Sequence, residues 1–197
     1  MSSDSKESHA FYQCRTRMII VAAPSGAGKS SFVEKISQED PRLVDIITYT
    51  TRAMRRGESQ GKPYHFVSIP EFEALLKKDF FVEHAEVHEN YYGTPSDQIE
   101  AAWKQGHCVI MDIDVQGAET FRRKFPESKS IFIVPPSIDE LRRRVIKRDG
   151  KVPADLEVRM SNAEKEISRS HEFNFKVVND VFETSYAQFK KIVADLL

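Results

Sequence analysis

The chain has 197 residues, of which 40% are hydrophobic and 30% charged, with only 8 glycines and 9 prolines. This composition excludes collagen-like, low-complexity and wholly disordered proteins, and the length is sufficient for one hydrophobic core. The 29 basic and 30 acidic residues leave a formal charge of -1, so neither nucleic acid nor a membrane surface is expected as a partner.

Residues 1–17 are Ser-rich and charged without periodicity, and they predict a disordered tail. The apolar run at 18–24 is too short to span a bilayer, and the segment before it lacks a signal-peptide core. Cys14 and Cys108 do not have the spacing of a paired motif, and Cys108 is expected to pack as a small hydrophobic residue. We therefore expect a cytoplasmic protein, and both a monomer and a homo-oligomer are compatible with the sequence.

From residue 18 onward, short apolar runs alternate with amphipathic segments, a pattern typical of strands that feed helices in an α/β sheet. Continuous apolar runs are typical of strands covered on both faces. They predict largely parallel core strands at 18–22, 108–112, 130–134 and 175–178.

Capping signals mark several helices. Ser68 with Glu71 and Ser137 with Glu140 fit capping boxes, and Pro95 is expected at a first helical position with Gly106 past the end of that helix. Further helices are predicted from Lys29, from Asp155 and from about Thr184. Residues 48–94 hold short polar and aromatic strands at 64–67 and 81–87, and they predict a lobe inserted into the sheet domain.

The segment APSGAGKS, residues 23–30, follows one predicted strand and precedes a helix. In such a loop, backbone N–H groups and the helix N-terminus converge on phosphate oxygens, the Lys29 side chain reaches the outer phosphates, and the Ser30 hydroxyl can ligate Mg²⁺. Ala23 replaces the usual first glycine, and an alanine at this position requires only an ordinary φ angle. The segment predicts a triphosphate site; the alternative is a glycine-rich turn without a ligand.

Two further clusters carry candidate chemistry. Asp112 and Asp114 end an apolar run, and alternation along a strand places both on one face, where they could hold the water shell of a metal ion. The cluster TTRAMRRGE, residues 50–58, could clamp a phosphate through its arginines and threonines. The alternatives are solvated acids after a buried strand and a basic loop that faces solvent.

The segments APSGAGKS, TTRAMRRGE, FVEHAEVHENYYGT, DIDVQG, IFIVPPS and VVND occur in the order and spacing of guanylate kinases. Between about residues 18 and 197 the chain resembles this family, which transfers the terminal phosphate of ATP to GMP. The resemblance implies a P-loop nucleoside monophosphate kinase fold of class α/β, with a mostly parallel sheet flanked by helices. It also implies a core at 18–47 and 95–197, a GMP-binding lobe at about 48–94 and a helical lid at about 144–160.

The resemblance assigns roles to residues that match the family motifs. The donor ATP is expected at Ala23, Pro24, Ser25, Gly26, Ala27, Gly28, Lys29, Ser30, Arg144 and Arg148, with Mg²⁺ at Ser30. The acceptor phosphate is expected at Arg52, Arg55, Tyr64 and Tyr92; guanine at Thr48, Glu83 and Thr94; and Asp112, Asp114 and Arg159 border the acceptor. Catalysis is assigned to Lys29, Arg55, Arg148 and Arg159. GMP, and also dGMP, are the expected acceptors.

The Glu83 carboxylate suits the N1–H and amino donors of guanine, which adenine lacks on that edge. Tyr91 is expected to pack, and His84 and His88 to be neighbours of the site. Thr48 replaces the serine often found. Asp149 replaces a usual glycine after the lid arginine, with Gly150 next, so the resemblance does not define the backbone conformation of the lid at these positions. A scaffold domain that binds peptides and a kinase for a phosphorylated sugar are the alternatives; intact Lys29 and Ser30 disfavour the first.

Overall fold

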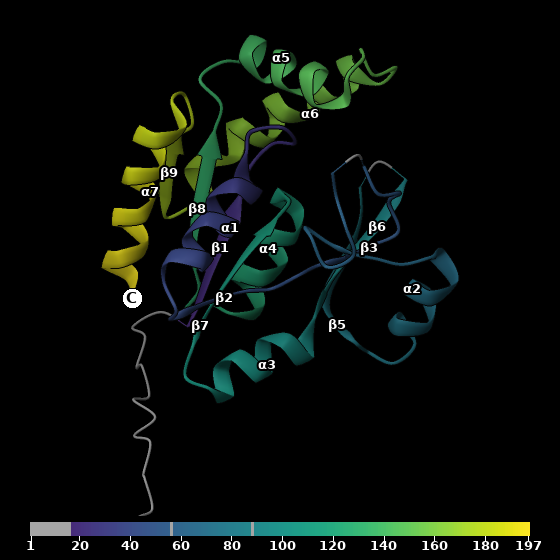
Figure 1. The fold of residues 1–197 in the computed structure, drawn as a ribbon, viewed down its shortest axis with the longest axis vertical. Coiled ribbons are helices and arrows are strands. Elements are labelled where there is room, and N and C mark those ends of the chain that lie inside the picture. Colours follow the sequence, from purple (N-terminus) through teal and green to yellow (C-terminus); the bar gives the residue numbers. More distant parts are fainter. Residues whose placement is uncertain (1–16, 56, 88) are drawn as a thin grey trace, which may run out of the picture.

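The computed structural model describes residues 17–55, 57–87 and 89–197. Residues 1–16 of the predicted tail, with Cys14, and residues Arg56 and His88 lie outside these ranges. Figure 1 shows a parallel sheet between two layers of helices, a second small sheet on one side of it, and two helices that extend over one end of the main sheet. Across the described residues, no helix is long and apolar enough to cross a membrane.

The main sheet has five parallel strands in the order β2-β7-β1-β8-β9. In the same spatial order, the strands are β2 (Leu43–Asp45), β7 (Cys108–Ile113), β1 (Met18–Ala22), β8 (Lys129–Val134) and β9 (Phe175–Val178). Every residue of the central strand β1 is buried, which is why its sequence is a continuous apolar run.

Alternate residues of β1 belong to two different hydrophobic clusters, because successive side chains of a strand point to opposite faces. Ile19 and Val21 pack with α1 (Lys29–Glu39), α5 (Ile138–Asp149), α6 (Leu156–Ser168) and α7 (Phe182–Leu196). Ile20 and Ala22 pack with α3 (Ser96–Lys104) and α4 (Val115–Lys124). Cys108 is completely buried in the first cluster, as expected for a small hydrophobic residue.

The second sheet has four strands in the order β4-β3-β6-β5 and is mixed, since β3 pairs in parallel with β4 and antiparallel with β6. Its strands are β3 (Tyr49–Thr50), β4 (His65–Phe66), β5 (Phe81–Val87) and β6 (Asn90–Pro95), and α2 (Ile69–Leu76) packs on it. Phe72 of α2 stacks on Phe81 and Tyr91, with ring centroids 4.6 and 5.6 Å apart. Tyr91 therefore packs as expected.

The predicted α/β class and parallel core are confirmed. The strands at 18–22, 81–87 and 175–178 have the predicted bounds, and the reciprocal capping box of Ser68 and Glu71 is present. The predicted strand 64–67 is shorter, 108–112 and 130–134 are each one residue longer, and the last helix begins at Phe182 rather than near Thr184. Asp155 is an N-cap, and the helix begins at Leu156.

Two capping predictions need correction. Pro95 is not in the first helical turn: it ends β6 and is the N-cap of α3, because its backbone is still extended. Ser137 caps α5 by accepting a hydrogen bond from the Glu140 N–H, while the Glu140 side chain pairs with Arg143 and Arg144. The 3-10 helix η1 (Arg169–Glu172) and the elements β2, β3, β6 and α4 were not predicted.

Candidate active site

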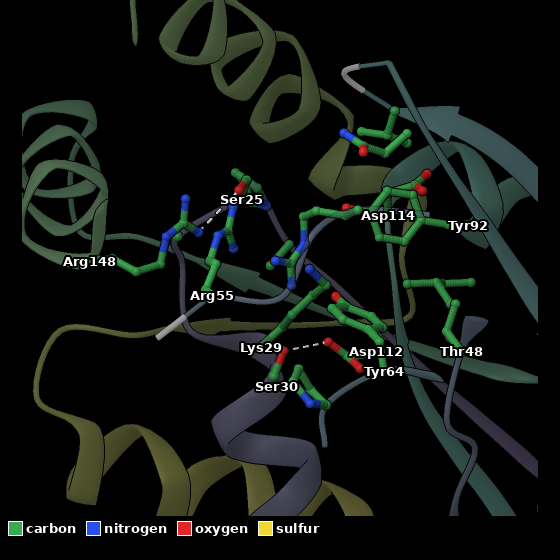
Figure 2. A pocket seen from close by; sticks show the side chains of 18 of the residues that line it. Ser25, Lys29, Ser30, Thr48, Arg55, Tyr64, Tyr92, Asp112, Asp114 and Arg148 are labelled. Carbon is green, nitrogen blue, oxygen red and sulfur yellow. Dashed lines mark hydrogen bonds between the residues drawn. The ribbon is translucent and has the colours of Figure 1, made fainter. Parts of the chain in front are cut away.

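The predicted site residues gather around one cavity of about 740 Å³, at the carboxyl ends of the main parallel strands and between the second sheet and α5 and α6. All of them except Ala27 line it: Ala23, Pro24, Ser25, Gly26, Gly28, Lys29, Ser30, Thr48, Arg52, Arg55, Tyr64, Glu83, Tyr92, Thr94, Asp112, Asp114, Arg144, Arg148 and Arg159. Figure 2 shows Lys29, Ser30 and Asp112 on one side of Tyr64, with Arg55 and Arg148 approaching Ser25.

The loop between β1 and α1 needs glycine at two positions. Gly26 and Gly28 both have a φ of 94°, which L side chains rarely adopt. A Cβ on Gly26 would lie 2.8 Å from Val145 Cγ2, and one on Gly28 would lie 2.8 Å from Asn179 Nδ2. The loop is thus pressed against α5 and against the segment after β9, so its two glycines are fixed by packing as well as by φ.

Ala27 lies below the loop and is completely buried. Its backbone N–H donates to the Pro24 carbonyl at 3.0 Å, and its carbonyl accepts a hydrogen bond from Asn179 Nδ2 at 2.8 Å. Asn179 is itself 6% exposed and follows β9. Ala27 and Asn179 therefore shape the loop from behind rather than facing the cavity.

Lys29, Ser30 and Asp112 meet where β7 passes the N-terminus of α1. The Ser30 hydroxyl donates to Asp112 Oδ2 at 2.6 Å (Figure 2). Burial raises the pKa of Asp112, whereas the positive charge of Lys29 and the Ser30 hydrogen bond lower it. A lysine, a hydroxyl and a carboxylate thus form one electrostatically coupled group at the end of the loop.

The prediction that Asp112 and Asp114 lie on one face of the same strand is wrong for Asp114. Strand β7 ends at Ile113, and Asp114 is the N-cap of α4, where its Oδ1 accepts a hydrogen bond from the Gly117 N–H at 2.8 Å. Its negative charge also raises the pKa of Glu83, so Asp114 borders the polar pocket described below.

Arg52 lies beside Tyr64, which in turn contacts Tyr92. Its guanidinium pairs with the Glu58 carboxylate at 2.8 Å and lies 5.5 Å from the Tyr64 ring centre. Tyr64 and Tyr92 meet edge to face, with centroids 5.7 Å apart. Burial raises the pKa of Tyr64 above its ordinary value, so its hydroxyl stays protonated and can donate a hydrogen bond. An anion placed among these groups would face one cation and two hydroxyl donors.

Arg55 belongs to the same loop but faces the opposite side of the cavity. Its backbone N–H donates to Glu58 Oε2 at 2.7 Å, and its side chain approaches Arg148 (Figure 2). Burial lowers the pKa of Arg55, and the charges of Arg148 and Arg52 lower it further. This gathering of like charges indicates a site for anions.

Thr48, Glu83 and Thr94 form a buried polar pocket, with exposed fractions of 6%, 8% and 0%. Thr94 Oγ1 donates to Glu83 Oε2 at 3.4 Å, while Thr48 Oγ1 is buried without a hydrogen-bond partner. Burial, together with the negative charge of Asp114, raises the pKa of Glu83 from 4.5 to about 7. Buried polar groups are normally satisfied, so this pocket fits a polar ligand with N–H donors.

This pKa shift predicts how stability depends on pH. The folded protein keeps a proton on Glu83 up to a pH of about 7, whereas the unfolded chain releases it near 4.5. Without nucleotide, the free energy of unfolding is therefore expected to fall as pH rises between these values, by at most about 1.4 kcal/mol per pH unit for this group. Glu83→Gln should flatten the fall, measured by urea unfolding across this range.

Asp45 provides the control, because burial raises its pKa to about 7 although it does not line the cavity. Asp45→Asn should flatten the same fall independently of Glu83→Gln, so the double variant should flatten it more than either single substitution. An identical slope in the parent protein and Glu83→Gln would contradict the prediction.

Arg144, Arg148 and Arg159 approach the cavity from α5 and α6. Arg144 Nε pairs with Glu140 at 2.9 Å, and Arg148 Nη1 donates to Ser25 Oγ at 3.4 Å. Arg144 and Arg148 are one helical turn apart, and both line the cavity, as the spacing predicts. Arg159 pairs with Asp155 one turn before it, and with Asp149 at the end of α5.

Three residues that support the site were missed. Asn179 holds the phosphate-loop carbonyl, Glu58 joins Arg52 to the backbone of Arg55, and Glu166 lines the cavity near Lys29. Burial raises the pKa of Glu166 to about 7, and Lys29 opposes this shift. The segments VVND and RRGE contain the first two, so these motifs could have indicated them. His84, in contrast, is exposed and does not line the cavity.

The oxygen ligands beside Lys29 suit a hard cation. Mg²⁺ prefers oxygen ligands and is usually held by one or two protein groups together with water and substrate phosphates. The Ser30 hydroxyl and the Asp112 carboxylate fit this pattern. Among the residues that the structure describes, no group of three or more His, Cys, Asp or Glu side chains could hold a metal ion by itself.

Comparison with known proteins gives a consistent result. Residues 15–196 match the guanylate kinase family. The chain is 64% identical over 183 residues to a guanylate kinase of Bdellovibrio bacteriovorus, and the matched region covers 93% of this chain and 99% of that protein. A guanylate kinase of Pasteurella multocida is 45% identical over 179 residues, covering 89% of this chain and 86% of the relative. The crystal structure of guanylate kinase from Anaplasma phagocytophilum matches with a TM-score of 0.75 and 31% identity, over 95% of this chain and 89% of that one.

Proposed function

The chain belongs to the guanylate kinase family and is an ATP:GMP phosphotransferase, and we propose that the transfer takes place in the cavity between the phosphate loop, the second sheet and helices α5 and α6. The observation that carries this proposal is the position of two unlike sites in one cavity. Lys29 and the loop offer a site for phosphates, and Thr48, Glu83 and Thr94 offer a buried polar pocket for a base.

The donor ATP lies along the phosphate loop in this proposal. Loop N–H groups and the N-terminus of α1 receive the phosphate oxygens, because the helix dipole and its unpaired donors favour anions. Lys29 reaches the outer phosphates, and Arg144 and Arg148 approach them from α5. Ser30 and Asp112 would hold Mg²⁺, which would neutralise charge on the donor phosphates.

The acceptor GMP occupies the opposite part of the cavity. Its phosphate lies among Arg52, Tyr64 and Tyr92, with Arg55 on the side of the donor. Its base enters the pocket of Thr48, Glu83 and Thr94. An ionised Glu83 accepts hydrogen bonds from the guanine N1–H and amino groups, and adenine has no matching donors on that edge. Glu83 therefore loses its proton when GMP binds, because the guanine donors then stabilise the carboxylate.

The reaction needs little general-base help, because the acceptor is already a phosphate anion. The residues must instead align two anions that repel each other and stabilise the charge on the transferring group. Lys29, Arg55, Arg148 and Arg159 supply that charge in the proposal. The inserted second sheet and the α5–α6 segment are expected to close over the substrates and exclude water. We place the reaction in the cytoplasm, which holds the ATP and GMP pools.

An assay of ADP release with different acceptors tests this function. GMP and dGMP are expected to support turnover. AMP and UMP are expected to give much lower rates, because neither adenine nor uracil presents the pair of N–H donors that guanine offers to Glu83. Turnover of a phosphorylated sugar instead of GMP would favour a different kinase, and peptide binding without ADP release would favour a scaffold domain.

Glu83→Gln tests the base pocket. The amide keeps the size of the side chain but replaces one acceptor oxygen by an N–H₂ donor that opposes the donors of guanine. The GMP concentration needed for half-maximal rate is expected to rise by about 10²-fold or more, because a buried pair is left unmatched. Selectivity over AMP should relax, and the KM for ATP should stay near that of the parent. Unchanged GMP saturation kinetics would contradict the assignment.

A further inference from the structure

Helix α5 ends at Asp149, the position at which the sequence departs from the family pattern, and the next residue, Gly150, has a φ of 68°. A carboxylate at the C-terminal end of a helix faces the negative end of the helix dipole, which is unfavourable. The helix itself therefore gains nothing from an acid at this position. The reason for Asp149 has to lie in what its side chain contacts.

The Asp149 carboxylate binds two arginines from two different helices. Arg148 donates through Nε to Oδ1 at 2.8 Å and through Nη2 to Oδ2 at 3.4 Å, so that it approaches with two nitrogens. Arg159 of α6 donates through Nη1 to Oδ2 at 3.2 Å. The Asp149 side chain is 16% exposed, so these contacts are made in a partly dehydrated environment. Charge-assisted bonds of this kind are stronger than neutral ones.

These contacts also determine the direction of Arg148. With Nε and Nη2 on Asp149, its third nitrogen, Nη1, points to Ser25 Oγ in the phosphate loop at 3.4 Å (Figure 2). Arg159 is oriented similarly, since its Nε is on Asp155 at 2.8 Å while Nη1 is on Asp149. The Arg148 guanidinium is thus fixed along one edge, and the Arg159 guanidinium is held at two of its three nitrogens.

The charges around Asp149 support the same conclusion. Arg55 approaches from the second sheet, and the positive charge of Arg148 lowers its pKa, whereas the charge of Asp149 raises it. The arginine charges likewise lower the pKa of Asp149 against the effect of burial, so it stays ionised. The Asp149 carboxylate therefore offsets the repulsion that three neighbouring guanidinium groups exert on one another.

We propose that Asp149 is a positioning residue for phosphoryl transfer, which holds the guanidinium groups of Arg148 and Arg159 together over the phosphate loop before the nucleotides arrive. The inference rests on the proposed function of these two arginines at the transferring phosphate. A carboxylate presents two oxygens to an arginine much as a phosphate does, so the arginines already have the separation and direction that a phosphoryl group requires.

Asp149→Asn is the first test. The amide keeps the shape and one acceptor oxygen but loses the charge and replaces the other oxygen by an N–H₂ donor, so it cannot keep all three arginine contacts. We expect kcat to fall by about 10- to 100-fold, because misplaced groups lose catalytic contacts, while the KM for GMP stays unchanged. Asp149→Glu keeps a carboxylate and should recover most of the loss. Loss of a merely structural contact would not produce this pattern.

Thermal unfolding separates positioning from stability. Asp149→Asn loses the ion pairs with Arg148 and Arg159 but also removes an acid from the C-terminal end of a helix, so its Tm should fall by only a few degrees and the protein should stay folded in the assay. Asp195, an exposed acid in the last turn of α7, provides the control for the helix-end effect alone: Asp195→Asn should leave both the fold and kcat unchanged. Unfolding of Asp149→Asn at the assay temperature, with a matching loss of kcat, would overturn the inference.

A double-mutant cycle with Arg148→Met completes the design. If Asp149 acts through Arg148, Asp149→Asn should lower kcat much less in the Arg148→Met background than in the parent. Full additivity would overturn the inference, as would a higher kcat and tighter ATP binding in Asp149→Asn, since Asp149 would then compete with phosphate. If Arg148→Met and Arg159→Met both keep parental turnover, the proposed function of the arginines fails as well; if they lose turnover and Asp149→Asn does not, only this inference fails.

Discussion

Lys29→Ala is expected to lower kcat by about 10³-fold or more while the protein remains folded. Lys29 is the first residue of α1, and its side chain lines the cavity. Burial raises the pKa of two acids there, Asp112 and Glu166, and the charge of Lys29 opposes both shifts. Without this cation, the outer phosphates of ATP would meet these two acids without the lysine charge that lies beside them. Turnover is measured as ADP release at saturating GMP, and the fold by circular dichroism.

Two variants serve as controls for this result. Lys29→Arg keeps the charge but presents a wider planar group, so it should recover part of the activity. Lys35 lies on the same helix and contacts Tyr186 away from the cavity, and Lys35→Ala should leave kcat unchanged. Activity of Lys29→Ala close to that of the parent would remove the phosphate-loop assignment, because no other lysine of the described residues lines the cavity.

The parts of the fold that were predicted are those whose cause lies within a short stretch of sequence. Strand β1 is a continuous apolar run, and α2 begins at a capping box formed by adjacent residues. Strands β2 and β3 were missed because they contain only three and two residues, and β6 was missed because it includes a glycine and a proline, which normally disfavour strands. Their pairing partners, which stabilise them, are distant in the sequence.

Helix α4 was missed for a similar reason. Gly117 lies in its first turn and lowers the helix propensity of the segment. The structure explains this glycine, since a Cβ there would come within 3.2 Å of Glu83 Oε1. The residue is therefore determined by a tertiary contact between α4 and the base pocket, which periodicity within the segment does not reveal.

The composition of the site was predicted more completely than its internal contacts. Lys29, Glu83 and Arg148 were named from motifs, and the structure brings them to one cavity. The pairing of Asp149 with Arg148 and Arg159 was not predicted, because it joins the end of one helix to the first turn of the next. The same holds for Asn179, which reaches the phosphate loop from a segment 152 residues away.

Arg148→Met and Arg159→Met are expected to lower kcat by about 10²- to 10³-fold, and much more than they weaken ATP binding. Only interactions that become stronger in the transition state accelerate the chemical step, and charge on the transferring group is what these cations would stabilise. Methionine retains much of the aliphatic length of arginine, so packing is largely preserved. The measurements are steady-state kinetics and, separately, the Kd of a non-hydrolysable ATP analogue.

Arg143 provides the matched control for both variants. It lies on the same helix as Arg148, but its side chain is 75% exposed and pairs with Glu140 outside the cavity. Arg143→Met should therefore leave both kcat and ATP affinity near those of the parent. If all three variants behaved alike, the arginines of α5 and α6 would be a solvated basic face. If Arg148→Met weakened ATP binding as much as it lowered kcat, Arg148 would hold the donor in the ground state rather than stabilise the transition state.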